Sequence, residues 1–205
     1  ETQWVYTGKE TPYAMGKYYS EMEIWRGIAE GLPAVIVNPS VILGPGDWNN
    51  GSPSFFKTIW DGLPFYTNGT TGYVDVFDVV KAMIQLMENN IFEERFIVSA
   101  ENLSYKDFFD RIAYHLGKNP PSIYANNFLS GVGWRWEAVK SLFTGRPPQI
   151  NKDTVRIAHN KESYTHEKLR QTLDFKFTPV EESIKRITSL YKKDHQILET
   201  KEPAT

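Results

Sequence analysis

A tyrosine and a lysine four residues apart open the part of the chain that is best suited to acid–base chemistry. Tyr13 and Lys17 follow Thr11 and Pro12, which are favoured at the N-cap and in the first turn of a helix. Residues four apart lie on one helical face. An unperturbed tyrosine titrates at about pH 10, and a nearby positive charge stabilises the phenolate and lowers that value. Because acid–base catalysis works best when the pKa approaches the working pH, the pair predicts a tyrosine that exchanges protons with a substrate.

The spacing alone does not identify a site, because it occurs more than once. The three pairs are Tyr13/Lys17, Tyr114/Lys118 and Tyr164/Lys168. About one match is expected by chance at ordinary composition. The second pair spans a predicted helix end at Gly117, and the third begins a short charged helix with no strand after it. Only the first is followed by a helix stop, an apolar strand at 33–37 and a glycine-rich loop. The context therefore selects Tyr13.

Composition restricts the class of protein. With 205 residues, of which 40% are hydrophobic and 14% aromatic, the chain can bury a core and form one domain or one and a half. A net charge of −2 gives no electrostatic case for binding nucleic acid or an anionic membrane. No apolar run approaches the roughly 18 residues of a membrane span. The absence of cysteine excludes disulfides and fits a reducing compartment, so we predict a cytoplasmic location. The four histidines show no ligand spacing, and no metal site is expected.

Two short apolar strands separated by helices predict an α/β fold. The strands, at 35–37 and 95–98, lack polar alternation, as parallel strands covered on both faces do. The helix at 11–30 has apolar stripes on two sides, and we expect both to be buried. Asn68-Gly69 predicts a hairpin over 65–76. Two parallel strands do not make a complete sheet, so the expected fold is the second half of a doubly wound parallel sheet.

The remaining sequence predicts mainly helices. Asp78 is expected to cap one helix, and the pattern Ser104-Tyr-Lys-Asp107 resembles a capping box that opens another. Both Asp75 and Asp78 are predicted to be caps and loop hydrogen-bonders rather than catalysts. Further helices are expected over 129–143, 151–159, 165–173 and 179–191, followed by a polar tail.

Three motifs together resemble the extended short-chain dehydrogenase/reductase family. The run from Pro12 to Trp25 is similar to the active-site helix of that family, and the segment 38–46 is similar to the chain after its sixth strand. The run 73–79 resembles a third signature at the start of a later helix. The trailing tryptophan and the C-terminal region are most similar to dihydroflavonol-reductase-like members, which are commonly described as NAD-dependent epimerase/dehydratases.

The resemblance implies a domain organisation. Residues 1–100 would form the C-terminal half of a Rossmann-type NAD(P)-binding domain that carries the active-site helix and a hairpin insertion. Residues 101–191 would form a mainly helical substrate-binding subdomain, and residues 192–205 a flexible tail.

The resemblance also implies residue roles. Tyr13 would donate or accept a proton at a substrate hydroxyl or carbonyl, while hydride moves to or from a nicotinamide. Lys17 would bind the nicotinamide ribose and stabilise the phenolate. The implied cofactor is NAD or NADP, and the implied cofactor-binding residues are Lys17, Asn38, Pro39, Ser40 and Ser54. For Asn38, turn formation is an equally good interpretation. The loop 47–52 and the C-terminal helices would form the substrate pocket.

The sequence departs from the family in one large respect. A dinucleotide site needs a glycine-rich turn between the first strand and helix, and Gly131-Val-Gly133 lacks the third glycine. The catalytic Ser/Thr of the family has no strand to lie on, and Thr2 and Thr7 lie in a polar loop. The chain begins at Glu1, with no initiator Met and no signal peptide. We therefore expect that the N-terminal cofactor half is absent from this chain and that the chain alone is inactive.

Three functions remain open. The preferred one is a fragment of an NAD(P)-dependent oxidoreductase that reduces a small-molecule carbonyl or oxidises a secondary alcohol. The alternative is a nucleoside-diphosphate-sugar epimerase or dehydratase, which is weakened by the scattered positions of the arginines. The third is that the isolated chain serves as an interaction module. The second apolar stripe of the helix at 11–30 would also permit a homodimer.

Overall fold

The computed structural model describes residue 8 and residues 10–126 and 152–201. Several sequence predictions therefore lie outside the described residues. They concern the helix over 129–143, which includes the Gly131-Val-Gly133 run, and the loop that holds Thr2 and Thr7.

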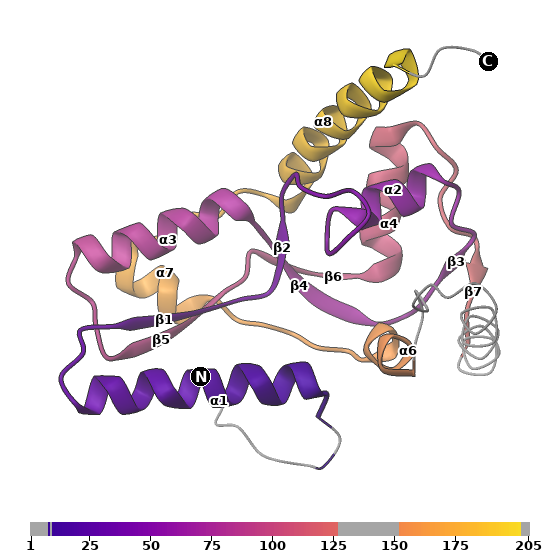
Figure 1. The fold of residues 1–205 in the computed structure, drawn as a ribbon. Helices are drawn as coiled ribbons and strands as arrows, with labels where there is room; N and C mark the ends of the chain where they lie inside the picture. Colours follow the sequence, from indigo (N-terminus) through magenta and orange to yellow (C-terminus); the bar gives the residue numbers. More distant parts are fainter. Residues whose placement is uncertain (1–7, 9, 127–151, 202–205) are drawn as a thin grey trace.

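The sheet nearest the first helix has the predicted parallel strands. Helix α1 (Pro12–Ala29) is followed by β1 (Val35–Pro39), and β1 pairs in parallel with β5 (Glu94–Val98), with Val35 opposite Glu94 and Pro39 opposite Val98. The strand predictions at 35–37 and 95–98 are thus confirmed. In Figure 1 this pair of strands lies between α1 on one side and α3 (Val76–Glu88) and α7 (Glu167–Leu173) on the other.

One hydrophobic cluster fills the α3 and α7 side of this sheet. Val35 and Val37 of β1 pack against it, and its buried members come from β4, α3, β5, α7 and the segment after α7. They are Val74, Val79, Ala82, Leu86, Phe96, Val98, Leu169 and Phe175. Since side chains alternate along a strand, the residues between the valines face α1.

A second sheet joins parallel and antiparallel strands. β2 (Val41–Leu43) runs parallel to β4 (Thr70–Asp75), and β4 runs antiparallel to β6 (Glu101–Ser104). Helices α2 (Ser54–Trp60), α4 (Tyr105–Leu116) and α8 (Val180–Lys201) pack beside it around a second hydrophobic cluster. This cluster contains Leu43, Phe56 and Tyr73 together with Ile112 and Ile184, so one core combines residues from both sides of the predicted boundary at residue 100. The boundary itself stays a prediction.

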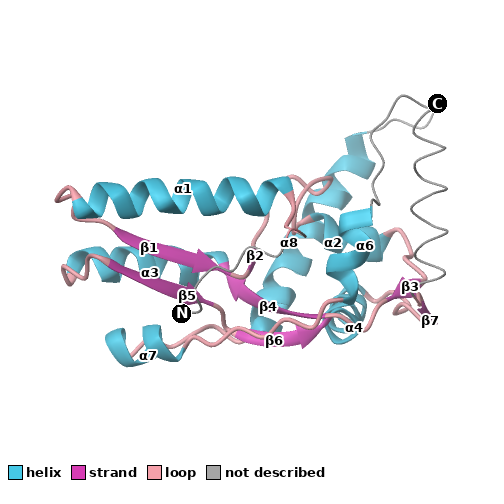
Figure 2. Cartoon of the chain, turned by 90° about the horizontal axis from the view of Figure 1, so that it is seen from below, coloured by secondary structure: helices cyan, strands magenta, loops and turns pink. Residues whose placement is uncertain are grey.

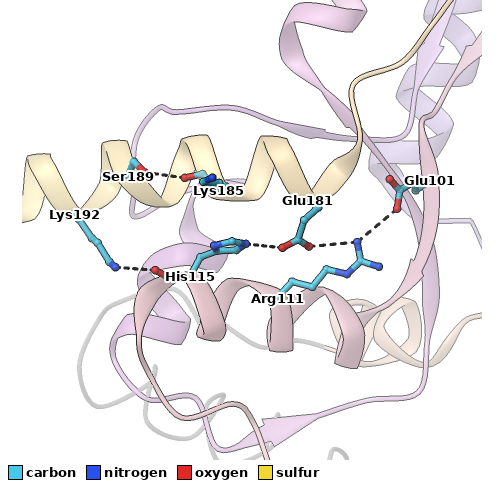
Figure 3. Close-up of polar contacts among 7 residues, drawn as sticks. All are labelled: Glu101, Arg111, His115, Glu181, Lys185, Ser189 and Lys192. Carbon is cyan, nitrogen blue, oxygen red and sulfur yellow. Dashed lines mark hydrogen bonds and ion pairs between the residues drawn. The ribbon is translucent and has the colours of Figure 1, made fainter.

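Polar contacts cross-link α4 and α8 in addition to the shared core. His115 Nε2 lies 2.5 Å from Glu181 Oε1, and Lys192 Nζ donates to the carbonyl of His115 across 2.7 Å (Figure 3). Arg111 Nη1 lies 3.6 Å from carboxylate oxygens of both Glu101 and Glu181. These contacts hold the C-terminal helix against the second sheet.

Several local predictions are confirmed. Thr11 is the N-cap of α1 and Pro12 its first residue, and Thr11 Oγ1 accepts a hydrogen bond from Ala14 N across 3.1 Å. Ser104 caps α4 and forms the expected capping box with Asp107, and Gly117 ends α4 in the left-handed conformation with φ of 70°. Helix α6 (Lys152–His159) and helix α7 also lie where they were predicted.

Four expectations are wrong. The hairpin is absent, because β3 (Phe65–Tyr66) pairs with β7 (Ile123–Tyr124) rather than with β4. The cap of α3 is Asp75, whose side chain accepts from Phe77 N across 2.9 Å, and not Asp78. No residue of helix α1 is fully buried: Trp25 and Ile28 are half-buried while Met22 and Ile24 are exposed, so the expected burial of both apolar stripes is not seen within the described part of the chain. Helix α8 continues through Lys201 instead of giving way to a tail at residue 192.

Candidate active site

The tyrosine–lysine pair lies on the accessible surface of α1. The side chain of Tyr13 is 75% exposed, and the Lys17 ammonium lies 5.7 Å from the centroid of its ring. That is within the range of a weak cation–π contact. Within the described residues, neither the Tyr13 hydroxyl nor the Lys17 ammonium makes a hydrogen bond. Both groups are therefore available to a ligand that approaches this end of the helix.

Glu21, one turn beyond Lys17, fastens α1 to the first sheet. Its Oε1 accepts from Arg95 Nη1 of β5 across 2.7 Å and from Trp25 Nε1 across 3.2 Å. Its Oε2 accepts from Asn38 Nδ2 of β1 across 3.3 Å. Burial opposes ionisation of Glu21, but the hydrogen bonds from Arg95, Trp25 and Asn38 outweigh it and hold the pKa of this carboxyl below its usual range.

The predicted residue Asn38 is thereby placed in a structural contact. Its side-chain amide donates to Glu21 from the α1 face of the sheet. This contact favours the interpretation that Asn38 shapes the end of β1 over direct contact with a cofactor. Pro39 is the last residue of β1, opposite Val98 of β5.

Ser40 joins the carboxyl ends of the two strands. Its backbone N–H donates to the carbonyl of Val98 across 3.1 Å, and its hydroxyl donates to Ser99 Oγ across 3.0 Å. Gly72 of β4 lies against this junction, where a Cβ atom would be 2.4 Å from Ser99 Oγ and 2.9 Å from Ser40 Cβ. Only glycine leaves enough room at position 72 for the Ser40–Ser99 pair.

The position of α1 brings Lys17 level with Ser40. Helix α1 and strand β1 run in opposite directions side by side (Figure 2). From Glu21 back to Lys17 is about 6 Å along the helix axis, and from Asn38 on to Ser40 is about 7 Å along the strand direction. Because Glu21 contacts Asn38, these two steps lead to the same height at the carboxyl end of the sheet.

Ser54 is placed apart from the other predicted site residues. It begins α2, and its hydroxyl donates to the carbonyl of Gly51 across 2.7 Å, within its own loop. The loop before it is folded on itself, since Asp47 accepts from Asn49 N and Ser52 donates to the carbonyl of Ile42. The backbone hydrogen bond from Asn49, followed by the side-chain bonds from Asn50 and Asn49, lowers the pKa of Asp47. The contact of Ser54 with a cofactor stays a prediction.

The residues present fit one end of a nicotinamide dinucleotide. An exposed ammonium at Lys17, level with Ser40, can donate to ribose hydroxyls, and the adjacent phenol can reach a group bound beside the ring. Among the described residues, no Gly-x-Gly-x-x-Gly turn lies between a strand and a helix to hold the pyrophosphate. The binding of a cofactor by these residues stays a prediction.

Sequence reasoning missed the residues that support this site. Glu21, Ser99 and Gly72 were not identified, and Arg95 was noted only as one of several scattered arginines. A signal was present for Glu21, which follows Tyr13 and Lys17 at the same four-residue spacing and so lies along the same side of the helix. No local pattern points to Ser99 or Gly72, because their contacts are formed by strands that are distant in sequence.

Other classes of site depend on grouped metal ligands or on a long apolar helix. In this part of the chain no group of three or more His, Asp or Glu side chains could hold a metal ion. Among the described helices, none has both the length and the apolar character needed to cross a membrane.

No family model matches the sequence. Comparison with curated proteins finds relatives nonetheless. The chain is 25% identical over 157 residues to the sterol demethylase protein B of Methylococcus capsulatus, which covers 73% of this chain and 47% of that protein. It is 24% identical over 180 residues to a candidate dihydroflavonol 4-reductase of Synechocystis, covering 84% of this chain and 52% of the relative. It is 35% identical over 103 residues to the tetraketide alpha-pyrone reductase 2 of Arabidopsis thaliana, which covers 48% of this chain and 32% of that relative.

Solved structures show the same fold. A nucleoside-diphosphate-sugar epimerase from Pseudomonas aeruginosa aligns with a TM-score of 0.69 at 19% identity, over 92% of this chain and 57% of the epimerase. A dTDP-glucose 4,6-dehydratase from Bacillus anthracis, solved in complex with NAD, aligns with a TM-score of 0.66 at 12% identity. The alignment covers 96% of this chain and 58% of the dehydratase.

These comparisons confirm the resemblance that the motifs predicted. The relatives and structural neighbours of this chain are dihydroflavonol-reductase-like and epimerase/dehydratase enzymes of the short-chain dehydrogenase/reductase family, and the chain has their Rossmann-like α/β fold. The chain spans about half the length of the first two curated relatives, at 47% and 52% of their sequences.

Proposed function

We propose that this chain carries the proton-transfer part of an NAD(P)-dependent oxidoreductase site, with Tyr13 as its acid and base. The observation that carries the proposal is the exposed Tyr13–Lys17 pair on a helix that Glu21 fastens level with the carboxyl end of β1. Ligands of doubly wound folds bind outside the carboxyl ends of the strands. The relatives are reductases, epimerases and dehydratases, which supports an enzymatic function of this general kind.

The residues of the chain have separate roles in the proposed reaction. Lys17 binds the ribose hydroxyls of the cofactor and keeps a positive charge beside the phenol. Tyr13 transfers a proton to or from the oxygen of the substrate. Ser40, held by Ser99, borders the cofactor at the end of β1. The nicotinamide, when bound, supplies or accepts the hydride. The cytoplasm as location and a homodimer as assembly belong to the same proposal.

The preferred substrate is a small carbonyl compound or secondary alcohol. The similarity to a candidate dihydroflavonol 4-reductase and a tetraketide alpha-pyrone reductase favours this choice. A nucleoside-diphosphate sugar is the second candidate, because an epimerase and a dehydratase of such substrates share the fold.

Net cofactor consumption separates the two candidates. The full-length protein is incubated with NADPH or NADH and a panel of ketones and aldehydes, and in parallel with UDP- and dTDP-sugars. Stoichiometric oxidation of the cofactor with a carbonyl compound supports the reductase. Interconversion of sugars without net change in the cofactor would refute the reductase and support the epimerase, and no reaction with either class would refute both.

A further inference from the structure

Helix α1 is attached to the sheet in an unusual way for a helix that carries a reactive pair. None of its residues is buried, and none belongs to either hydrophobic cluster. The position of most helices on a sheet is set by apolar side chains that interlock with the strands. Polar contacts must therefore contribute more than usual to the position of α1.

Glu21 makes the contacts that reach the sheet from the middle of the helix. The two oxygens of this carboxylate bind donors from two different strands, Arg95 of β5 and Asn38 of β1. Arg95 lies opposite Ile36 in the register, so the two donors belong to different levels of the sheet. A carboxylate held at two levels and by two strands fixes the height of the helix and its rotation together.

The contacts of Glu21 are also well shielded from water. Its side chain is 17% exposed and that of Arg95 21% exposed, so this ion pair is less solvated than those on the outer side of α1. The Trp25 indole N–H, one turn further along, donates to the oxygen that Arg95 binds. Charge-assisted hydrogen bonds of this kind are shorter and stronger than neutral ones.

We propose that Glu21 is the positioning residue of the site: by binding Arg95 and Asn38 it sets the height and rotation of α1, and thereby places Tyr13 and Lys17 at the level of Ser40. This inference rests on the proposed function, in which Tyr13 and Lys17 act on the substrate and cofactor. Glu21 lies two turns from the phenol and acts on it only through the helix.

A small displacement is enough to matter. Misplacing a reacting group by about 1 Å can slow catalysis about 10²-fold. Without the carboxylate, α1 keeps its internal hydrogen bonds but loses the polar links that Glu21 makes to both strands. We expect Glu21→Ala to lower kcat about 10- to 100-fold at a temperature at which the variant is still folded. Glu21→Gln keeps an acceptor for Arg95 and Trp25, so it is expected to recover most of this loss.

Glu23 provides a matched control on the same helix. It is also paired, with Arg26 across 2.9 Å, but this pair lies within α1 and the Glu23 side chain is 68% exposed. Glu23→Ala is expected to leave kcat unchanged. The assay uses the protein as its gene encodes it, with kcat and KM for the cofactor and the substrate measured separately for each variant.

A second measurement on the 205-residue chain needs no activity. The indole N–H resonance of Trp25, assigned by its loss in Trp25→Phe, is followed by NMR as the pH is lowered. We expect it to shift with a midpoint below 4.5, because its acceptor Glu21 has a lowered pKa. In Glu21→Gln this shift should disappear.

The outcomes separate the inference from the function beneath it. Equal kcat values for Glu21→Ala and Glu23→Ala, in a protein that Tyr13→Phe inactivates, would overturn the positioning role and leave the proposed function standing. An unaltered rate in Tyr13→Phe would overturn the proposed function itself. A Trp25 resonance that titrates identically with and without the Glu21 carboxylate would remove the anchor on which the inference depends.

Discussion

Asp78 at the start of α3 and Thr178 shortly before α8 are joined by two hydrogen bonds, although one hundred positions separate them in the sequence. Thr178 donates its backbone N–H to Asp78 Oδ2 across 2.7 Å and its hydroxyl to Oδ1 across 3.2 Å. The neighbouring Asp75 is also buried and accepts from Ser183 and Arg186 of α8. Two carboxylates, one at the end of β4 and one in the first turn of α3, therefore attach the C-terminal helix and the residues just before it to the sheet region of the fold.

We expect Asp78→Ala to destabilise the chain by about 1–3 kcal/mol, because it leaves the Thr178 N–H without its partner in a site where Asp78 is 5% exposed. Urea unfolding followed by circular dichroism measures this loss. Asp61→Ala is the control: Asp61 pairs with Lys57 on the surface and should contribute less than about 1 kcal/mol. Equal stabilities for the two variants would contradict the role given to Asp78.

Replacement of Gly72 tests the packing around Ser40. In Gly72→Ala the new Cβ would lie 2.4 Å from Ser99 Oγ and 2.8 Å from Tyr164 Cδ2, so the Ser40–Ser99 pair must move. Overpacking of this kind costs about 1–3 kcal/mol. Gly16→Ala is the matched control, because a Cβ there meets nothing within 4 Å in the middle of α1, and it should stabilise by about 0.5–1 kcal/mol. Thermal or urea unfolding measures the change in the free energy of unfolding, which should be a loss for Gly72→Ala and a gain for Gly16→Ala. A Gly72→Ala chain as stable as the wild type would show that the site is less tightly packed than described.

The pH dependence of stability follows from the Glu21 carboxyl. The pKa of Glu21 in the folded chain is below the ordinary glutamate value of about 4.5, so its ionised form stabilises the fold above that pH. The contribution is lost as the pH falls through the lower folded value. We expect the difference in free energy of unfolding between the wild type and Glu21→Gln to be constant at pH 6–7 and to shrink below about pH 4.5. A difference that persists unchanged to pH 2–3 would contradict the assignment.

Local features of the fold were accessible to sequence analysis. The cap at Thr11, the capping box at Ser104 and the stop at Gly117 depend on residues within one or two turns, and the structure has each of them. The apolar strands at 35–37 and 95–98 were recognised because burial on both faces removes polar alternation. The Tyr13–Lys17 contact follows from helical spacing alone.

Contacts between distant segments were not accessible. The Asn68-Gly69 signal predicted a hairpin, but β3 pairs with β7, which lies beyond β4, α3, β5, β6 and α4 in the sequence. Asp75 and Asp78 are both acceptable caps, and only the path of β4 decides that the helix begins at Val76. Glu21 binds Arg95 across a separation of 74 residues, a pairing that composition and spacing do not specify.

The described residues cover only the nicotinamide end of the proposed site. We therefore expect the 205-residue chain by itself to bind NADH and NADPH weakly or not at all, because its described part offers no Gly-x-Gly-x-x-Gly turn between a strand and a helix for the pyrophosphate. Isothermal titration calorimetry of the purified chain measures this directly. Tight binding with a stoichiometry of one would contradict the expectation and would require a phosphate site elsewhere in the chain.

The replacement Tyr13→Phe in the protein as its gene encodes it tests the central claim most directly. It removes one hydroxyl from a side chain that is 75% exposed and has no hydrogen bond within the described residues, so folding and cofactor binding should be unaffected. We predict that kcat falls by about 10²–10⁴-fold, the usual contribution of an acid–base group, while the dissociation constant of the dinucleotide stays the same. A variant that turns over its substrate at the wild-type rate would contradict the account.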